Sequence, residues 1–323
     1  MKSYKSSLDF WRIVFTYLIV ALHYGYSVGW KLGVEFFFIL SGMLLAAECN
    51  IKKTGFKQYV WKRIRRLYPH YIFSFFVFVL ILDNGGGIAG LIQVIRKSML
   101  EICMLQILGI GDYASNHGAV WYISSLFLSS IFLYGCLKRL SKRKNFFILV
   151  VLIVLGYFSQ FLFGSMCIAT WESPIGFCLL PGLVRGLSEM SLGILCFYIG
   201  RMLDEKGIWK RKREFLIGIE FLSMLFIVIY TYKHLDNYVL ILALFCVAVT
   251  TGYFCQHDIL SHTLIRKFSL LTYPIYLNHP IWLIILGSSC PFFIVLLVVT
   301  IYSVVTYYVL KRLERLFRKE KQT

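Results

Sequence analysis

The stretch FFILVVLIVLGYFSQFLF at residues 146–163 decides the fold class, because it runs without a single charged residue. A second stretch, FLIGIEFLSMLFIVIY at residues 215–230, is nearly as apolar. An α-helix needs about 20 such residues to cross a bilayer. Of the 323 residues, 59% are hydrophobic, whereas a soluble domain has roughly 45–50%. The sequence therefore predicts an all-α, polytopic membrane helix bundle.

Hydropathy along the chain predicts about ten transmembrane helices. The expected spans are 8–29, 32–48, 66–82, 120–137, 146–163, 177–200, 215–232, 238–254, 268–286 and 292–310. Residues 1–310 then form one integral membrane domain, and residues 311–323 form a basic cytoplasmic tail.

Positive charge is unevenly distributed over these spans. The chain has 34 Lys+Arg and 16 Asp+Glu, a net charge of +18. Connections on one side of the expected membrane hold 28 of the cations and those on the other side hold 4, with Arg12 and Arg185 inside spans. The positive-inside rule then places both termini in the cytoplasm. Since orientation accounts for most of the charge, a nucleic-acid partner is not expected.

The segment 83–119 is apolar in part but carries Arg96, Lys97 and Glu101. An additional span here would move the basic run KRLSKRKN (138–145) to the outer side. We therefore expect an interfacial or re-entrant helix at the outer surface.

The nine cysteines lie mostly in apolar runs and show no metal-ligand spacing. A free thiol in such a run packs as a small hydrophobic side chain. We expect structural cysteines and no metal site.

Ionisable residues at membrane depth are costly and are often functional. Arg12 and His23 lie eleven residues apart in the first span, which places them on one helix face, separated by about 16 Å. Arg12 can extend to the inner headgroups and His23 can be a hydrogen-bonded packing residue. Alternatively, both belong to an active site.

The second span begins with GVEFFFILSG (33–42) and carries Glu35 near its outer end. Glu35 can approach His23 across the turn 27–31 and orient its imidazole. Alternatively, it is an exposed acid at a helix N-terminus. Ser41 and Gly42 are typical of a close helix crossing. In the sixth span, Arg185 and Glu189 have i, i+4 spacing, which favours mutual neutralisation.

Four cations, Lys62, Arg63, Arg65 and Arg66, precede the third span in YVWKRIRRLYPHY (59–71). Such a run usually anchors topology, but arginines also bind phosphate bidentately, so it suits a phosphate-bearing ligand from the cytosol. Pro69 is expected in the first helical turn.

The ninth span contains Tyr273, Asn278 and His279, and both Pro274 and Pro280 interrupt its backbone hydrogen bonding. Prolines in membrane helices often accompany a cavity. We expect these three polar residues either to line a substrate site or to form hydrogen bonds that serve helix packing. Trp121 in HGAVWYISSLF, at the start of the fourth span, is either an interfacial anchor or part of the same lining.

Taken together, these motifs resemble those of acyltransferase family 3, the integral membrane O-acyltransferases. The motifs, which occur in family order over nearly the whole chain, are LDFWRIVFTYLIVALH (8–23), GVEFFFILSG (33–42), KRIRRLYP (62–69), WYISSLF (121–127) and LTYPIYLNHP (271–280). Members are ten-helix bundles that move an acyl group, usually acetyl from acetyl-CoA, to a sugar hydroxyl.

The resemblance implies roles for individual residues. His23 would be the catalytic histidine, Arg12 its partner in handling the acyl donor, and Arg65 and Arg66 part of the family's basic motif. Glu35 stands where Asp is common. Leu126 occupies a position that is usually Glu in members that modify peptidoglycan or O-antigen. This departure points to the branch that modifies exopolysaccharides and other cell-surface polysaccharides.

We therefore expect a multi-pass enzyme of the bacterial plasma membrane, with membrane lipid, acyl-CoA and a glycan acceptor as partners. His23, Glu35 and Arg12 would be catalytic, and Arg63, Arg65 and Arg66 would hold the CoA phosphates. The alternative is a transporter or flippase of a lipid-linked sugar, which explains the spans and buried charges equally well but not the Arg12–His23 and GVEFFFILSG motifs.

Overall fold

The computed structural model describes residues 7–26, 32–52, 54–82, 87–108, 120–162, 181–232, 238–255, 263–287 and 289–319. All regular structure within these ranges is helical. The turn 27–31 and the expected structural cysteines Cys167 and Cys178 lie outside the described residues. The seven described cysteines are free thiols.

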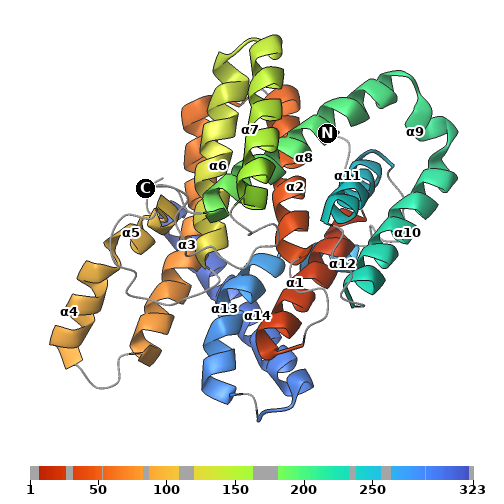
Figure 1. Ribbon diagram of the computed structural model, residues 1–323. Coiled ribbons are helices and arrows are strands. Elements are labelled where there is room, and N and C mark those ends of the chain that lie inside the picture. The colour runs from red at the N-terminus through yellow and green to blue at the C-terminus, as the bar shows by residue number, and fades with distance from the viewer. Residues whose placement is uncertain are drawn as a thin grey trace.

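Long helices alternate with a few short ones along the chain (Figure 1). They are α1 (Leu8–Tyr24), α2 (Leu32–Ala47), η1 (Glu48–Lys52), α3 (Phe56–Leu82), α4 (Gly87–Lys97), α5 (Met99–Ile102), η2 (Gln106–Leu108), α6 (Val120–Arg139), α7 (Lys142–Leu162), α8 (Pro181–Glu205), α9 (Ile208–Arg211), α10 (Arg213–Tyr232), α11 (Tyr238–Phe254), α12 (Thr263–Ser269), α13 (Thr272–Leu286) and α14 (Phe292–Lys319).

Each expected span coincides with helical structure, but fewer than ten helices meet the length and hydropathy of a membrane span. Within the described residues there are five: Gly33–Ile51, Phe56–Ile81, Val120–Arg139, Pro181–Glu205 and Phe292–Leu316. A sixth is obtained if α12 and α13, which meet at a bend of 49°, are counted as one broken span.

Two boundaries differ from the sequence-based expectation. Helix α3 begins at Phe56, so the basic motif is helical and Pro69 lies inside the helix rather than in its first turn. Helix α14 continues past residue 310 to Lys319, so residues 311–319 extend the last helix.

Helix α4, with 11 residues, is about 16 Å long and too short to cross a bilayer. It lies beside α3 at the edge of the bundle (Figure 1).

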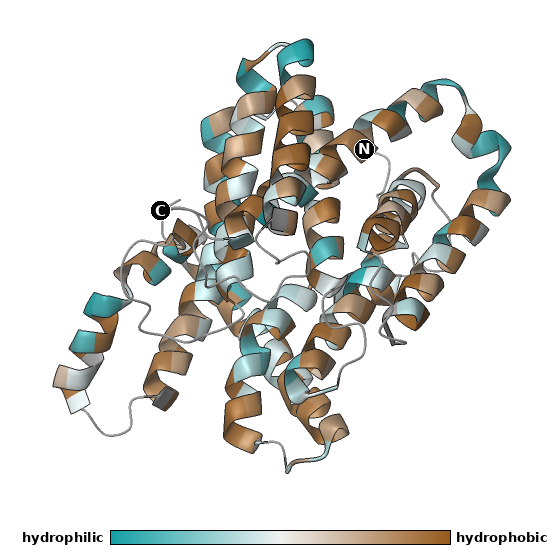
Figure 2. Ribbon diagram, viewed as in Figure 1, coloured by the Kyte–Doolittle hydropathy of each residue, from teal (hydrophilic) through white to brown (hydrophobic). Residues whose placement is uncertain are grey.

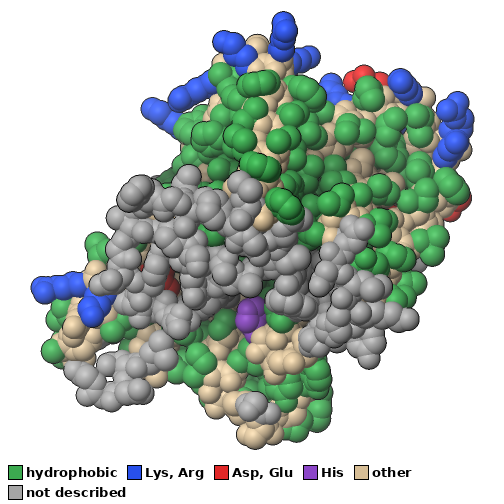
Figure 3. Space-filling view, viewed as in Figure 1, with side chains coloured by type: hydrophobic (Ala, Val, Ile, Leu, Met, Phe, Trp, Pro, Cys, Tyr) green, Lys and Arg blue, Asp and Glu red, His purple; other side chains and the backbone are tan. Residues whose placement is uncertain are grey.

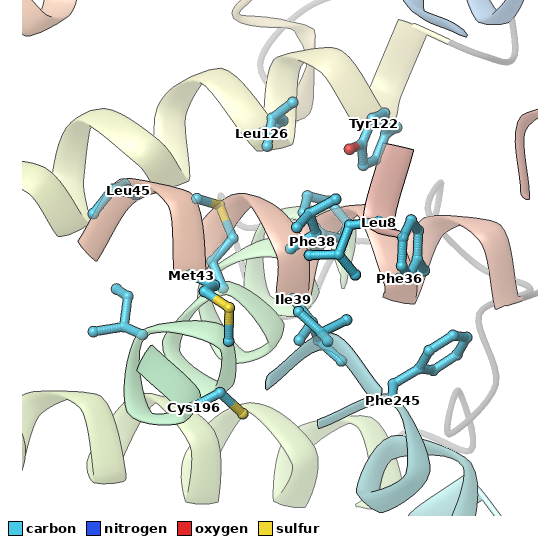
Figure 4. Packing of buried hydrophobic residues seen from close by; sticks show 14 of the residues in the cluster. Leu8, Phe36, Phe38, Ile39, Met43, Leu45, Tyr122, Leu126, Cys196 and Phe245 are labelled. Atoms are coloured by element: carbon cyan, nitrogen blue, oxygen red, sulfur yellow. The ribbon is translucent and has the colours of Figure 1, made fainter. Parts of the chain in front are cut away.

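The centre of the fold is a close crossing of α2 and α8, as the small residues Ser41 and Gly42 predicted. A Cβ atom on Gly42 would lie 2.0 Å from the carbonyl oxygen of Met190, and one on Gly193 would lie 1.9 Å from that of Ile39. Glycine is therefore required at both positions, because only its absent side chain lets the two backbones touch. Ile39 and Met43 are fully buried around this crossing (Figure 4).

A second, smaller core joins α1, α13 and α14. Val20, Ile275, Val295 and Val299 are all fully buried in it. Helix α1 ends just after these contacts, where Gly25 adopts a left-handed φ of 112°. This core holds the last turn of α1 against α13.

The outside of the bundle is apolar along the helices and basic at particular ends. Hydrophobic residues predominate along the long helices, and hydrophilic residues are concentrated at the α6–α7 turn and around α9 (Figure 2). Lysine and arginine side chains gather at the same places, with a smaller group on α4 (Figure 3).

Candidate active site

A cavity of about 140 Å³ opens between α1, α2, α3, α6 and α13, and three arginines reach it. Arg12 comes from α1, and Arg63 and Arg66 come from α3. Glu48 is the one acidic residue of its described lining, and it accepts a hydrogen bond from Lys62 at 2.5 Å. The cavity is lined by Arg12, Phe37, Leu40, Ser41, Leu44, Leu45, Glu48, Tyr59, Arg63, Arg66, Leu67, Tyr122, Ile123, Leu126, Thr272, Tyr273 and Tyr276.

Helical periodicity divides the basic motif of α3 between two surfaces. Arg63 and Arg66 are three residues apart, so both point to the cavity. Arg65 instead lies against the outward-facing Trp61, with its guanidinium carbon 5.0 Å from the ring centroid. It lines a separate open cleft with Gln58, Trp61, Lys62, Arg66 and Glu314. Arg65 therefore lies outside the cavity that Arg63 and Arg66 line, whereas Arg66 reaches both the cavity and the outer cleft.

Local contacts hold the cavity arginines in place. Arg63 donates from Nε to the hydroxyl of Tyr59 at 3.1 Å. Arg12 donates to Asp9 at 3.2 Å and to Thr272 Oγ1 at 3.4 Å. The contact with Thr272 joins α1 to the beginning of α13, and the two contacts together position the Arg12 guanidinium at the cavity wall.

His23 lies in the last turn of α1, and its ring contacts His279 of α13. The two nitrogens, His23 Nδ1 and His279 Nε2, are 3.2 Å apart. Nδ1 of His23 is also 2.9 Å from the carbonyl oxygen of Ile19. His279 is fully buried, whereas His23 is exposed. His279 thus belongs beside the expected catalytic histidine rather than in the lining of the cavity.

Glu35 does not contact His23, and it is not exposed either, so both sequence-based interpretations of this residue are wrong. It is fully buried and forms an ion pair with Arg185. Arg185 also donates from Nε to Glu189 at 2.8 Å, which confirms the predicted contact of these two residues. Tyr238 donates to Glu189 at 3.1 Å and lies 3.4 Å from Glu35. Glu35 is therefore part of a buried ionic cluster between α2, α8 and α11.

The remaining expected lining residues lie in three different places. Tyr273 does line the cavity and donates to the Leu67 carbonyl at 3.0 Å. Asn278 instead donates to Ser303 and Thr306 of α14, each at 3.3 Å. The guanidinium carbon of Arg185 lies over the Trp121 ring, 5.7 Å from the ring centroid. Trp121 is not among the described residues that line the cavity.

Apart from Tyr273, the aromatic and hydroxyl residues of the lining were not predicted as lining residues by the sequence analysis. Tyr276 and Tyr122 both face the cavity, with ring centroids 5.4 Å apart. On α13, the residues Thr272 and Tyr276 are four apart, and on α2 the same spacing joins Phe37 and Ser41. This i, i+4 spacing within helices that also carry the motifs was the signal that could have found them.

Comparison with protein-family models identifies one family. The model of the acyltransferase domain of acyltransferase family 3 matches residues 5–310. No curated protein and no solved structure matches the chain. With its apolar helices and a family match over nearly its whole length, the chain belongs to acyltransferase family 3 and is a multi-pass membrane acyltransferase.

Proposed function

We propose that this protein transfers an acetyl or other short acyl group from cytosolic acyl-CoA to a sugar hydroxyl of a cell-surface or exported polysaccharide. The observation that carries the proposal is the cavity that collects Arg12, Arg63 and Arg66 from two helices. A site with three guanidinium groups and one carboxylate is suited to an anionic ligand.

The donor would bind with its phosphates at Arg63 and Arg66. Guanidinium groups bind phosphate oxygens through two parallel hydrogen bonds, which fixes position as well as charge. Arg12 lies on the neighbouring helix and would interact with the same donor. The apolar and aromatic remainder of the lining suits the uncharged pantetheine arm.

Tyr276 connects the cavity lining to the histidine pair. Tyr276 lines the cavity with its side chain, and its carbonyl oxygen is 2.7 Å from His279 Nδ1. His279 in turn contacts His23. Arg12 and His23 lie on one face of α1 about 16 Å apart. An extended pantetheine arm has a comparable length, so a donor held at the arginines would bring its thioester near His23.

At His23 the reaction needs one proton acceptor. His23 would take the proton of the sugar hydroxyl while the oxygen attacks the thioester carbonyl. The C–S bond then breaks, and the proton passes from the imidazolium to the CoA thiolate, so no proton is gained or lost overall. A positioned general base typically contributes about 10²–10⁴-fold to the rate.

The proposed orientation has ten spans and both termini in the cytoplasm. Two groups of exposed cations support the proposal that one side of the bundle is basic and faces the cytoplasm. They are Lys142, Arg143 and Lys144 at the α6–α7 turn, and Lys210 and Arg211 around α9. Leu126 in the cavity wall replaces a carboxylate with an apolar side chain. As in the branch with which the sequence shares this feature, a surface or exported polysaccharide would be the acceptor.

The test is acyl transfer by purified full-length protein in lipid nanodiscs. Radiolabelled acetyl-CoA and glycan fractions from the host envelope are supplied, and labelled glycan and released CoA thiol are measured. We expect base-labile label on the glycan, and its loss in His23→Ala protein that still binds CoA. Full activity of His23→Ala would refute the role of His23. Transport of a lipid-linked sugar without consumption of any acyl-CoA would refute the proposed function.

A further inference from the structure

The pairing of His23 and His279 has a feature that the transfer reaction alone does not explain: each ring presents a defined nitrogen to the other. His279 uses Nε2 and His23 uses Nδ1, with 3.2 Å between them. Neutral imidazole has one N–H donor and one acceptor nitrogen. The contact therefore requires one nitrogen to be protonated and the other not.

Pro280 decides which nitrogen of His279 carries the hydrogen. In a continuous α-helix, the N–H of residue 280 would donate to the carbonyl of Tyr276, but proline has no N–H. His279 Nδ1 lies 2.7 Å from that same carbonyl oxygen. Since a carbonyl can only accept, Nδ1 of His279 is the donor, and Nε2 of the neutral ring is an acceptor.

The polarity of His279 then sets the tautomer of His23. An acceptor at His279 Nε2 requires a hydrogen on His23 Nδ1. The Ile19 carbonyl, 2.9 Å from the same nitrogen, is a second acceptor and requires the same hydrogen. Nδ1 of His23 is thus protonated, and the lone pair is on Nε2 of a ring that is exposed at the end of α1.

We propose that His279 is a positioning residue, and that the Tyr276 carbonyl and Pro280 fix it in the state that makes Nε2 of His23 the base. The part that concerns catalysis rests on the proposed acyl transfer, whereas the tautomer itself does not. Packing holds the arrangement, because Val20 of α1 and Ile275 of α13 are both fully buried in the core that joins these helices.

The same contacts assist the reaction after the proton has moved. When Nε2 accepts the hydroxyl proton, Nδ1–H continues to donate to His279 and Ile19, so the imidazolium keeps its two acceptors. The proton on Nε2 then goes to the CoA thiolate as the C–S bond breaks. Neither His279 nor Pro280 exchanges a proton in this sequence, so both act through His23.

The first test reads the tautomer directly by ¹⁵N NMR of full-length protein with labelled histidine side chains in nanodiscs. The His23 signals are assigned by their loss in His23→Gln. We expect the Nδ1-protonated tautomer in the native chain. In His279→Leu we expect a mixture with a smaller share of that tautomer, because only the Ile19 carbonyl then favours it. Pro280→Ala should also give a mixture, because residue 280 then supplies an N–H to the Tyr276 carbonyl. Pro274→Ala, in the first turn of the same helix, is the matched control and should leave the signals unchanged.

The second test is kinetic. His279→Leu should lower kcat about tenfold or more, a part of the ~10²–10⁴-fold contribution of a general base, with the KM for acyl-CoA within about twofold. His279→Gln retains an acceptor near the position of Nε2 and should recover part of kcat. A merely structural role would give no such recovery.

The outcomes separate the two proposals. An Nε2-protonated His23 in the native chain, or a tautomer that is unchanged in both His279→Leu and Pro280→Ala, would overturn the positioning role. If the native chain shows the expected tautomer but transfers no acyl group from any acyl-CoA, the proposed function fails while the assignment of the pair holds.

Discussion

Arginine occurs in two contrasting settings inside this bundle. Arg185 is enclosed between Glu35 and Glu189, and all three side chains are buried. The exposed fraction is 4% for the Arg185 side chain and 0% for both carboxylate side chains. Arg12, Arg63 and Arg66 instead face a cavity, where Arg12 also pairs with the single carboxylate of Asp9. A charge with buried counter-ions stabilises the packing around it, whereas charges that face a cavity remain available to a ligand. Intramembrane charge therefore has two functions here, and the number of nearby carboxylates distinguishes them.

The largest effect is expected from Arg185→Leu, which tests the structural role of the enclosed arginine. Removing the cation leaves two buried carboxylates without their counter-ion, and loss of one partner of a buried pair typically costs about 3–5 kcal/mol. We expect a large drop in monodisperse protein and in the midpoint of thermal unfolding in detergent. A stable Arg185→Leu protein that has lost only CoA binding would contradict the structural role.

Two control variants accompany this experiment. Arg201 pairs with Glu205 at 3.4 Å, and both side chains are more than half exposed. Arg201→Gln should therefore change stability by only about 0–1 kcal/mol. Combining Arg185→Leu with Glu35→Gln and Glu189→Gln removes the uncompensated charges and should restore part of the lost stability.

The open arginines should show the opposite behaviour. Arg63→Ala and Arg66→Ala should each raise the KM for acyl-CoA about tenfold, since a hydrogen bond to a charged group contributes about 1.5–3 kcal/mol. Stability should change little, because neither side chain is enclosed by counter-ions. The measurement is acyl transfer across a range of acyl-CoA concentrations. An unchanged KM in both variants would show that the phosphates of acyl-CoA do not bind in this cavity.

Glu35→Gln tests whether Glu35 acts on His23 or on Arg185. The cluster has two carboxylates for one guanidinium, so neutralising one carboxylate leaves a matched pair of Arg185 and Glu189. We expect kcat within about fivefold of the native value and an unchanged pH profile of kcat, because a change of less than ~1 kcal/mol in the barrier changes the rate by less than a factor of about five. A displaced pH profile would show that Glu35 acts on the base.

The smallest effect is expected from Arg65→Ala. This arginine lies against Trp61 in the outer cleft, and an exposed cation–π contact contributes only about 0.5–1 kcal/mol. The KM for acyl-CoA should change by less than about threefold, in contrast to Arg66→Ala one residue further on. Equal effects of the two variants would place the donor phosphates in the outer cleft as well.

Sequence reasoning succeeded where the physics is local. Apolar runs located the helical segments, and the small residues Ser41 and Gly42 indicated the crossing that the Met190 contact confirms. The i, i+4 spacing predicted the Arg185–Glu189 contact. It did not predict where Arg65 lies, although the reason is local too: the start of α3 at Phe56 makes the basic motif helical, and the helix directs Arg65 to the outer cleft and not to the cavity.

The membrane class, the helical segments and the residue types capable of chemistry follow from the sequence, because hydropathy and spacing act over a few turns of one helix. The partners of these residues depend on the packing of helices that are distant in the chain. Glu35 meets Arg185 across a crossing that depends on Gly42 and Gly193. His23 meets His279, 256 residues further along the chain, through the core shared by α1 and α13. Such contacts depend on the register and angle at which two helices pack, and neither quantity is encoded in the periodicity of either helix alone.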